Sequence, residues 1–316
     1  MRNFVRVLRQ NRRTIIRAII AIAFFYLIIQ LVNYVIKSNE GKKMEELLNS
    51  KSSNSISNVK SNNDKDELVS NKSAITGKEI STKQLEEEVN VISNFINYCN
   101  TKDLEKAYSL LTDECKKQMY SSLEIFEKTN YDDVFGGASK TFQVENWVGN
   151  IYKVDIKEDA LATGKVSGYS KQDYMTIQEV NGEKKININN YIGYKKIDKT
   201  TSKDNISVNV VEKNTYKDYE EYTIKVTNSR NSIIQLDSTD STNTLYLEDD
   251  KGLKYYYYNH ELTNSTLTIA AGQTKEVTIK FYNTYVSTKK IDYIVFNNII
   301  SLNGQLSETL NLKAKI

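Results

Sequence analysis

One apolar stretch constrains this chain more than any other feature. Residues 14–36 read TIIRAIIAIAFFYLIIQLVNYVI, and every residue from Ala18 to Ile29 is apolar or aromatic. About 19 apolar residues in a helix rising roughly 1.5 Å per residue cross most of a hydrocarbon core of about 30 Å. Five arginines precede the stretch with no acidic residue to offset them. The N-terminus is therefore expected to stay cytoplasmic, and the chain after Lys37 to lie outside.

Three interpretations of this stretch compete. A cleaved signal peptide would end in a small-x-small cleavage site, but bulky residues follow the apolar core here. A buried helix of a soluble protein would not usually carry five arginines at one end and a long polar tract at the other. The sequence favours an uncleaved transmembrane signal anchor over 14–37, behind a cytoplasmic basic tail over 1–13. Arg17 can extend its side chain toward the cytoplasmic headgroups.

The distribution of charge along the chain indicates which class of partner is unfavourable. The whole chain has a formal net charge of +3, but residues 1–17 contain six arginines and no acids. The rest of the chain therefore carries a net charge of −3. A mildly acidic ectodomain lacks the basic surface that nucleic-acid binding needs, so the sequence argues against DNA or RNA as a partner.

The next segment, 38–80, is predicted to be a disordered linker, because Ser, Asn, Lys and Asp dominate it and little apolar surface is available to offset the entropy of ordering. Order is expected to begin at Ser81, which has the spacing of a capping box with Gln84. Leu85, Val89, Ile92 and Ile96 then recur at helical intervals, Thr101 can cap a second helix, and a third helix with Met119, Leu123 and Phe126 inward is expected after Thr112. Strands follow, among them 161–169 and 185–194, around an Asn181-Gly182 hairpin turn. We predict an α+β domain with an antiparallel sheet over 81–199.

Two segments of this domain carry a family resemblance. VISNFINYCNTKDLEKAYSLLTDECK (91–116) and IQEVNGEKKININNYIGY (177–194) resemble the helix, short-helix and N-G hairpin outline of the nuclear-transport-factor-like (cystatin-like cone) superfamily. The resemblance implies a cone-like three-helix plus antiparallel-sheet fold. Members of the family include enzymes, transport adaptors and parts of secretion machines, so the resemblance alone does not indicate which function this chain has. The domain contains no histidine, which argues against acid–base catalysis in the cone.

The remainder, 200–316, is predicted to be all-β. Turn signals separate candidate strands at intervals of about 8–14 residues, which is typical of a β-sandwich. The run LTIAAGQTKEVTIKF (267–281) resembles a feature of bacterial immunoglobulin-like modules. No Cys…Trp…Cys pattern is present, so the resemblance is to the disulfide-free type.

Aromatic side chains are the candidate ligand or partner contacts. In the cone-like domain they can line the cone or pack in the core, and in the run 255–258 an outward pair can stack on a sugar or a partner. The candidates are Trp147, Tyr152, Tyr174, Tyr191, Tyr194, Tyr255 and Tyr257.

Two cysteines, Cys99 and Cys115, leave two alternatives open. The external compartment permits a disulfide between them, but nothing in the sequence sets their distance. Two free, buried thiols are the other interpretation.

No catalytic, cofactor or metal site is predicted. The sequence has no Gly-rich phosphate loop, paired-cysteine zinc pattern or G-x-S-x-G elbow. His260, the only histidine, is expected in an exposed loop without a catalytic partner. The cluster of Asp237, Asp240, Asp249 and Asp250 does not match the spacing of a calcium loop.

These features predict a single-pass bacterial membrane protein whose bulk lies outside the cell and acts as a non-catalytic binding or scaffolding protein of the envelope. Its partner would be an envelope protein or a wall polymer. A subunit of a conjugation or secretion apparatus is the alternative, because an anchor followed by a cone domain is similar to the bitopic subunits of such machines. An ectoenzyme that uses the cone pocket is a third hypothesis.

Overall fold

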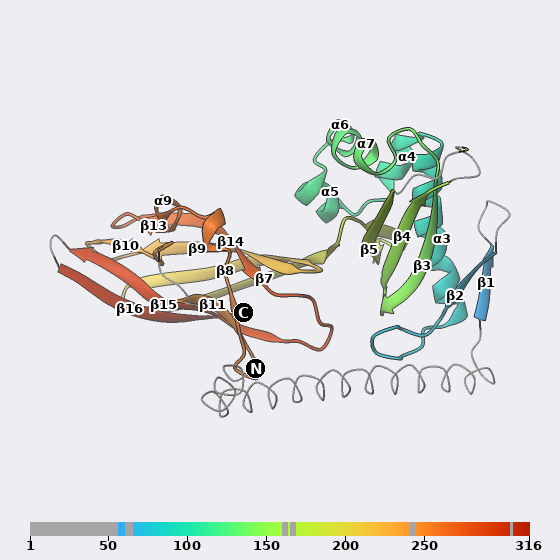
Figure 1. Ribbon diagram of the computed structural model, residues 1–316. Coiled ribbons are helices and arrows are strands. Elements are labelled where there is room, and N and C mark those ends of the chain that lie inside the picture. The colour runs from blue at the N-terminus through green and yellow to red at the C-terminus, as the bar shows by residue number, and fades with distance from the viewer. Residues whose placement is uncertain (1–55, 61–65, 160–163, 165–168, 241–243, 304–305) are drawn as a thin grey trace, which may run out of the picture. The chain divides into compact units, whose positions relative to one another are not determined.

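The computed structural model describes residues 56–60, 66–159, 164, 169–240, 244–303 and 306–316 (Figure 1). The predicted tail at 1–13 and the predicted anchor at 14–37 lie outside these residues. A search of the described helices for one that combines the length and the apolar character of a membrane span finds none.

The first described elements form an antiparallel hairpin of β1 (Ile56–Lys60) and β2 (Asp66–Ser70). The chain then runs along β3 (Lys140–Val148), where the Ala74 N–H donates to the Asn146 carbonyl at 2.8 Å and the Ser73 hydroxyl donates to the Trp147 carbonyl at 2.6 Å. These bonds partner backbone groups that a free strand edge would expose. Order therefore begins upstream of Ser81, within the segment predicted as a linker.

The helix α3 (Thr82–Asn100) follows the predicted pattern. The Ser81 hydroxyl accepts from the Gln84 N–H at 3.1 Å and caps the helix as expected, although the Gln84 side chain donates to Glu88 instead of closing a full capping box. The helix buries an apolar stripe at i, i+3 and i+4 spacing, which places one face against the sheet. The buried apolar residues are Leu85, Val89, Val91, Ile92, Phe95, Ile96 and Cys99.

The helices after α3 are shorter than the sequence predicts. The expected third helix breaks at Tyr120, and Ser122 caps a new start. Thr101, expected to cap the second helix, donates its hydroxyl to the Asn97 carbonyl of α3 instead. The elements are α4 (Leu104–Ser109), α5 (Asp113–Met119), α6 (Leu123–Phe126), the π-helical turn η2 (Glu127–Tyr131) and α7 (Asp132–Val134).

Next comes a four-stranded antiparallel sheet in the order β3-β4-β5-β6. Its remaining strands are β4 (Ile151–Glu158), β5 (Ser170–Val180) and β6 (Glu183–Asn187). The predicted hairpin turn is confirmed, since Asn181 and Gly182 both have positive φ, 54° and 82°. The predicted strand 161–169 lies almost entirely outside the described residues.

The single strand predicted over 185–194 is wrong, because a turn interrupts it. Asn189 and Asn190 adopt φ of 57° and 63°, a left-handed conformation that asparagine tolerates. The buried Asp173 carboxylate accepts both of their N–H groups, at 2.8 and 2.7 Å. The chain therefore leaves the first sheet at this turn and starts a new one.

That second sheet has the order β14-β9-β8-β7. Its strands are β7 (Tyr191–Lys203), β8 (Ile206–Tyr216), β9 (Tyr219–Asn228) and β14 (Thr274–Tyr282). Strand β7 passes through residue 199, where we predict the end of the α+β domain, and this boundary stays a prediction.

A third sheet has the order β12-β11-β15-β10-β13, with β16 paired to β15. Its strands are β10 (Ile233–Gln235), β11 (Leu245–Asp249), β12 (Lys254–Tyr256), β13 (Thr268–Ile269), β15 (Ile291–Asn303) and β16 (Leu306–Lys315), with the short helices η3 (Asn259–Glu261) and α9 (Asn264–Leu267) between them. Inward residues of the second and third sheets share one hydrophobic core. The structure thus confirms an α+β region followed by antiparallel β-sheets.

Candidate functional site

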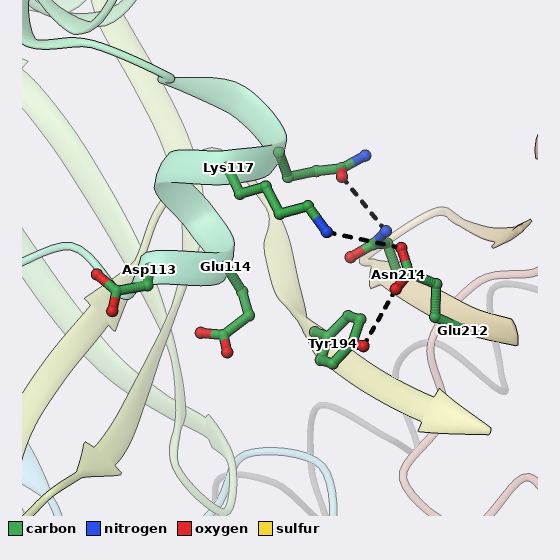
Figure 2. A pocket seen from close by; sticks show the side chains of 7 residues that line it. Asp113, Glu114, Lys117, Tyr194, Glu212 and Asn214 are labelled. Atoms are coloured by element: carbon green, nitrogen blue, oxygen red, sulfur yellow. Dashed lines mark hydrogen bonds and ion pairs between the residues drawn. The ribbon is translucent and has the colours of Figure 1, made fainter. Parts of the chain in front are cut away.

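A polar pocket of about 220 Å³ lies between helix α5 and the strands β7 and β8 (Figure 2). Helix residues form one wall and strand residues form the other. The lining residues are Asp113, Glu114, Lys117, Gln118, Tyr194, Glu212 and Asn214.

Thr112 places helix α5 at this position. Its hydroxyl oxygen caps the helix by accepting from the Cys115 N–H at 3.0 Å, and the same hydroxyl donates to the Asn187 side chain at 2.5 Å. The Thr112 N–H also donates to the Ile186 carbonyl of β6 at 3.1 Å. Cys115 is fully buried, so the helix turns its polar residues toward the pocket.

Strand pairing builds the opposite wall. Tyr194 of β7 lies directly across from Asn214 of β8, and alternation places Glu212 on the same face as Asn214. The Tyr194 hydroxyl donates to the Glu212 carboxylate at 3.1 Å, and the Lys117 ammonium lies 4.0 Å from the same carboxylate. Glu212 is therefore held from both walls.

The amide groups of the pocket are fixed as well. The Asn214 amide donates to the Gln118 side-chain carbonyl at 3.3 Å and accepts from the buried Tyr191 hydroxyl at 2.8 Å. The Gln118 amide donates to Glu221 at 3.0 Å. A single chain of hydrogen bonds thus runs from the interior, at Tyr191, to the surface, at Glu221.

The pocket has an excess of negative charge. Three carboxylates line it with a single ammonium, and Lys117 is committed to Glu212. Partial burial raises the pKa of Tyr194 and the pKa of the neighbouring Glu221. Carboxylates and amide carbonyls are hydrogen-bond acceptors, so the pocket suits a ligand that presents O–H or N–H donors. Across the described residues, no group of three or more His, Cys, Asp or Glu side chains is arranged to hold a metal ion.

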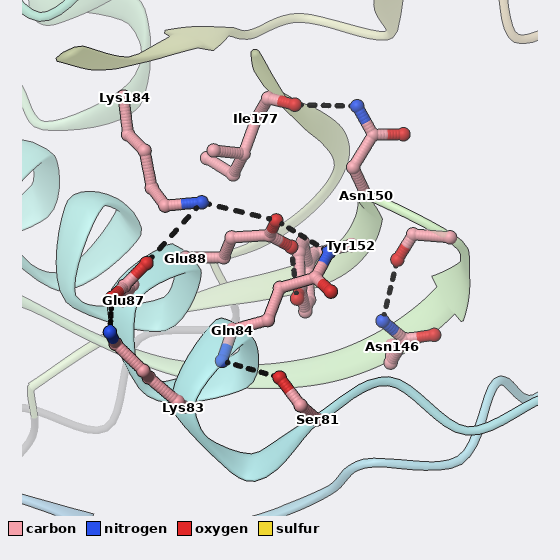
Figure 3. Close-up of polar contacts among 11 residues, drawn as sticks. Ser81, Lys83, Gln84, Glu87, Glu88, Asn146, Asn150, Tyr152, Ile177 and Lys184 are labelled. Atoms are coloured by element: carbon pink, nitrogen blue, oxygen red, sulfur yellow. Dashed lines mark hydrogen bonds and ion pairs between the residues drawn. The ribbon is translucent and has the colours of Figure 1, made fainter. Parts of the chain in front are cut away.

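Tyr194 is the one predicted contact residue that lines this pocket, and Tyr191 supports it from beneath through Asn214. Tyr152 is fully buried and donates its hydroxyl to Glu88 at 2.7 Å. Glu88 also accepts from the Gln84 side-chain amide at 3.0 Å and forms an ion pair with the Lys184 ammonium at 3.6 Å (Figure 3). This network joins helix α3 to the first sheet.

Trp147 and Tyr174 pack against each other instead of forming a cavity wall. Their ring centroids are 4.7 Å apart, and Tyr285, from the segment after β14, approaches Trp147 to 5.9 Å. The Lys217 ammonium lies 4.8 Å from the Tyr174 ring. These rings therefore join the first sheet to residues 217 and 285 of the β region.

In the tyrosine run at 255–258, the two candidate contacts, Tyr255 and Tyr257, are not the outward pair. Tyr257 is buried in the core of the β-sheets, and Tyr255 is half-buried and donates its hydroxyl to Asp249 at 3.0 Å. Tyr256 and Tyr258 point the other way. Alternation predicts two inward and two outward rings, but which pair is inward depends on strand register, which the sequence does not reveal.

Cys99 and Cys115 are both free, buried thiols. Burial raises the pKa of Cys115 to about 12 and that of Cys99 further, so both thiols stay protonated at neutral pH. His260 is exposed, as expected. Asp237 and Asp249 accept hydrogen bonds from their own loops, including the Thr244 hydroxyl and the Leu253 N–H.

Sequence reasoning did not identify the helix wall of the pocket. Helical periodicity, counted from the buried Cys115, indicates that Glu114 and Lys117 lie on an outward face of α5. It gives no indication that residues nearly 100 positions later, on β8, complete the site. Comparison of the chain with protein-family models, curated proteins and solved structures finds no match.

Proposed function

We propose that this chain is a membrane-anchored, extracytoplasmic binding or scaffolding protein of the bacterial cell envelope. The pocket between α5 and strands β7 and β8 would contact an envelope ligand or partner. In this proposal the anchor over 14–37 holds a cone-like α+β domain and an immunoglobulin-like sandwich outside the membrane. Support comes from the arginine-flanked apolar stretch and from the observed order of an α+β region followed by antiparallel sheets.

The observation that carries the proposal is the pre-arranged set of acceptors in the pocket. Glu212 is fixed by Tyr194 and Lys117, and Gln118 is fixed by Asn214 and Glu221. Groups held in this way lose little conformational freedom when a ligand arrives, which favours binding. These hydrogen bonds tie Glu212 to Tyr194 and Gln118 to Asn214, and they do not place a general base beside a nucleophile. We therefore propose a binding role without catalysis.

The proposal is tested by photo-crosslinking of the full-length chain in its native cells. A photoreactive amino acid replaces Glu114 in the pocket. The matched control replaces Lys83, whose side chain is 87% exposed on α3 and does not line the pocket. We expect ultraviolet light to join the Glu114 variant, and not the Lys83 variant, to wall material or an envelope protein.

Equal crosslinking from both positions would contradict the pocket as the contact site. Adducts with cytoplasmic proteins alone would contradict the external location. Crosslinks from Glu114 to several subunits of a membrane-spanning apparatus would favour the conjugation or secretion alternative over wall binding.

A further inference from the structure

Three tyrosine rings gather on the outer face of the second sheet, near the end where β9 begins and β14 ends. Register places Tyr219 directly opposite Tyr282, and Glu221 directly opposite Lys280. Because side chains alternate along a strand, these four residues share one face, while Phe281 and Tyr222 point into the core. Tyr258 joins them, since its N–H donates to the Lys280 carbonyl at 2.9 Å. We call Tyr219, Tyr258 and Tyr282 the tyrosine face.

The rings of the tyrosine face are in direct contact. Tyr258 and Tyr282 stack with centroids 3.3 Å apart and planes 18° apart, and Tyr282 is 49% exposed. The Lys280 ammonium lies 4.1 Å from the Tyr219 ring and 4.7 Å from the Tyr258 ring, and 3.2 Å from the Glu261 carboxylate. Tyr282 is exposed, and Tyr219 and Tyr258 are half-buried beneath and beside it. An exposed ring held in place by stacking and cation–π contacts is typical of a binding surface.

The tyrosine face adjoins the polar pocket. Glu221 stands beside Lys280 on this face and accepts from the amide of Gln118, which lines the pocket. Tyr219 also stacks on Tyr216, with centroids 4.2 Å apart, and Tyr216 contacts Tyr191 beneath the pocket. Aromatic faces and hydrogen-bond acceptors therefore follow one another along one side of the sheet, which suits an elongated ligand.

The charged residues beside the tyrosine face limit the chemical classes of ligand that could bind there. A cationic ligand would compete with Lys280, which already lies over two of the rings. A polyanion would meet the carboxylates of Glu221 and Glu261 on the tyrosine face and those of the pocket. A purely apolar ligand would take these carboxylates out of water and offer them no new hydrogen bond in exchange. A neutral sugar ring avoids all three costs, because its C–H face stacks on the negative face of a tyrosine ring and its hydroxyls donate to carboxylates.

We propose that the tyrosine face and the pocket together bind a neutral saccharide chain, with a sugar ring stacked on the free face of Tyr282, whose other face packs on Tyr258, and hydroxyl groups bound to the acceptors of the pocket. This inference rests on the proposed envelope-binding function and names the class of its ligand. Asn214 lies two strands from β14 and two residues along from Tyr282, a span of about 12 Å at strand spacings of about 4.8 Å and rises of about 3.4 Å per residue. This span exceeds one sugar ring, so a polymer should bind better than a monosaccharide.

The experiment measures co-sedimentation of the full-length chain, in lipid nanodiscs, with cell-wall material from its native cells. A tetrasaccharide of β-1,4-linked N-acetylglucosamine serves as a neutral competitor, and the monosaccharide as its control. Tyr282→Ala removes the most exposed ring of the face. Tyr256→Ala is the matched control, because Tyr256 is 36% exposed and belongs to the same tyrosine run but lies outside the tyrosine face.

We expect wild-type and Tyr256→Ala chains to sediment with the wall, and the tetrasaccharide to displace them at lower concentration than the monosaccharide. Tyr282→Ala should weaken binding by about tenfold, equivalent to about 1.4 kcal/mol. The thermal unfolding of both variants should match the wild type, so that loss of binding is not loss of fold.

Wall binding that neither Tyr282→Ala nor the tetrasaccharide reduces would overturn the saccharide inference and leave the proposed function standing. Binding that disappears only when the wall material is treated with protease would do the same and would indicate a protein partner. No retention by wall material, together with no pocket-specific crosslink in cells, would overturn both proposals.

Discussion

The α+β region and the β region hold their elements together in different ways. In the β region, strands contribute alternating apolar residues to a core shared by two sheets, and residues such as Ile224 and Phe281 are fully buried there. In the α+β region, the main helix is also joined to its sheet by the buried Glu88 and Tyr152. The β region also buries a polar group, Glu220, which accepts from the Tyr222 hydroxyl at 2.9 Å and the Asn283 amide at 2.8 Å. The two regions therefore differ in how regularly their apolar residues alternate, and in whether a polar pair joins a helix to a sheet.

The buried polar atoms that lack a hydrogen-bond partner sharpen this contrast. Four of the five such side-chain atoms among the described residues belong to the α+β region, on Ser93, Asn130, Asn146 and Thr176. Each unsatisfied group costs stability, so this interior is less optimised than the alternating strands. Removing a hydroxyl from the helix–sheet network of the α+β region should destabilise the chain, and so should truncating an alternating apolar residue of the β core.

The largest effect is expected from Phe281→Ala, which removes a fully buried ring that meets Tyr222 edge-on at 5.8 Å. The cavity should lower the free energy of unfolding by about 3–5 kcal/mol. Chemical denaturation of the full chain measures the change. The adjacent Tyr282→Ala, on the exposed face, is the control and should cost far less. Similar losses at both positions would contradict the alternation on which the β core depends.

A smaller effect is expected from Tyr152→Phe, which keeps the ring and removes the hydroxyl that donates to Glu88. One oxygen of a buried carboxylate then loses its partner, at a cost of about 1–3 kcal/mol. Tyr256→Phe, at an exposed tyrosine of the β region, is the matched control and should change stability by less than about 0.5 kcal/mol. Equal effects would show that the polar network does not distinguish the two regions.

Alkaline pH should weaken both regions together. Burial raises the pKa of Tyr152, Tyr191 and Tyr222, so the folded state favours their neutral phenols. This contribution to stability is complete below the unfolded pKa of about 10 and is lost as pH rises toward the folded values. The unfolding temperature should fall steeply above about pH 10, and phenolate absorbance at these residues should appear together with unfolding. A phenolate signal from all tyrosines in the folded state would contradict their burial.

The smallest effect is expected from Ser81→Ala, which removes the side-chain cap of α3 and should cost about 1 kcal/mol. Thermal or chemical unfolding measures it. Ser121→Ala, at an exposed serine that does not cap a helix, is the control and should be nearly neutral. An unchanged stability for Ser81→Ala would mean that the packing of α3, rather than its cap, sets where the helix begins.

Local patterns predicted much of the fold. The spacing of Leu85, Val89, Ile92 and Ile96 defined α3, and Asn181-Gly182 defined the hairpin between β5 and β6. The turn at Asn189-Asn190 was missed because the alternating pattern continues through it, and the buried Asp173 that stabilises it lies 16 residues earlier.

The site was harder to predict than the fold. Its two walls come from segments about 100 residues apart, and its aromatic face depends on which tyrosines of 255–258 point outward. Both depend on strand register and long-range packing, which periodicity alone does not determine. Tyr194 was identified as a contact, but the partners that give it a role, Glu212 and Lys117, were not.

The measurement that most directly tests the central proposal, an external envelope-binding protein, is protease shaving of intact, wall-stripped cells followed by mass spectrometry of the surviving peptides. The account predicts that peptides from 81–316 are lost while residues 1–17 are protected. Survival of 81–316 would contradict it, because the pocket and the tyrosine face would then lie on the cytoplasmic side, away from any wall polymer.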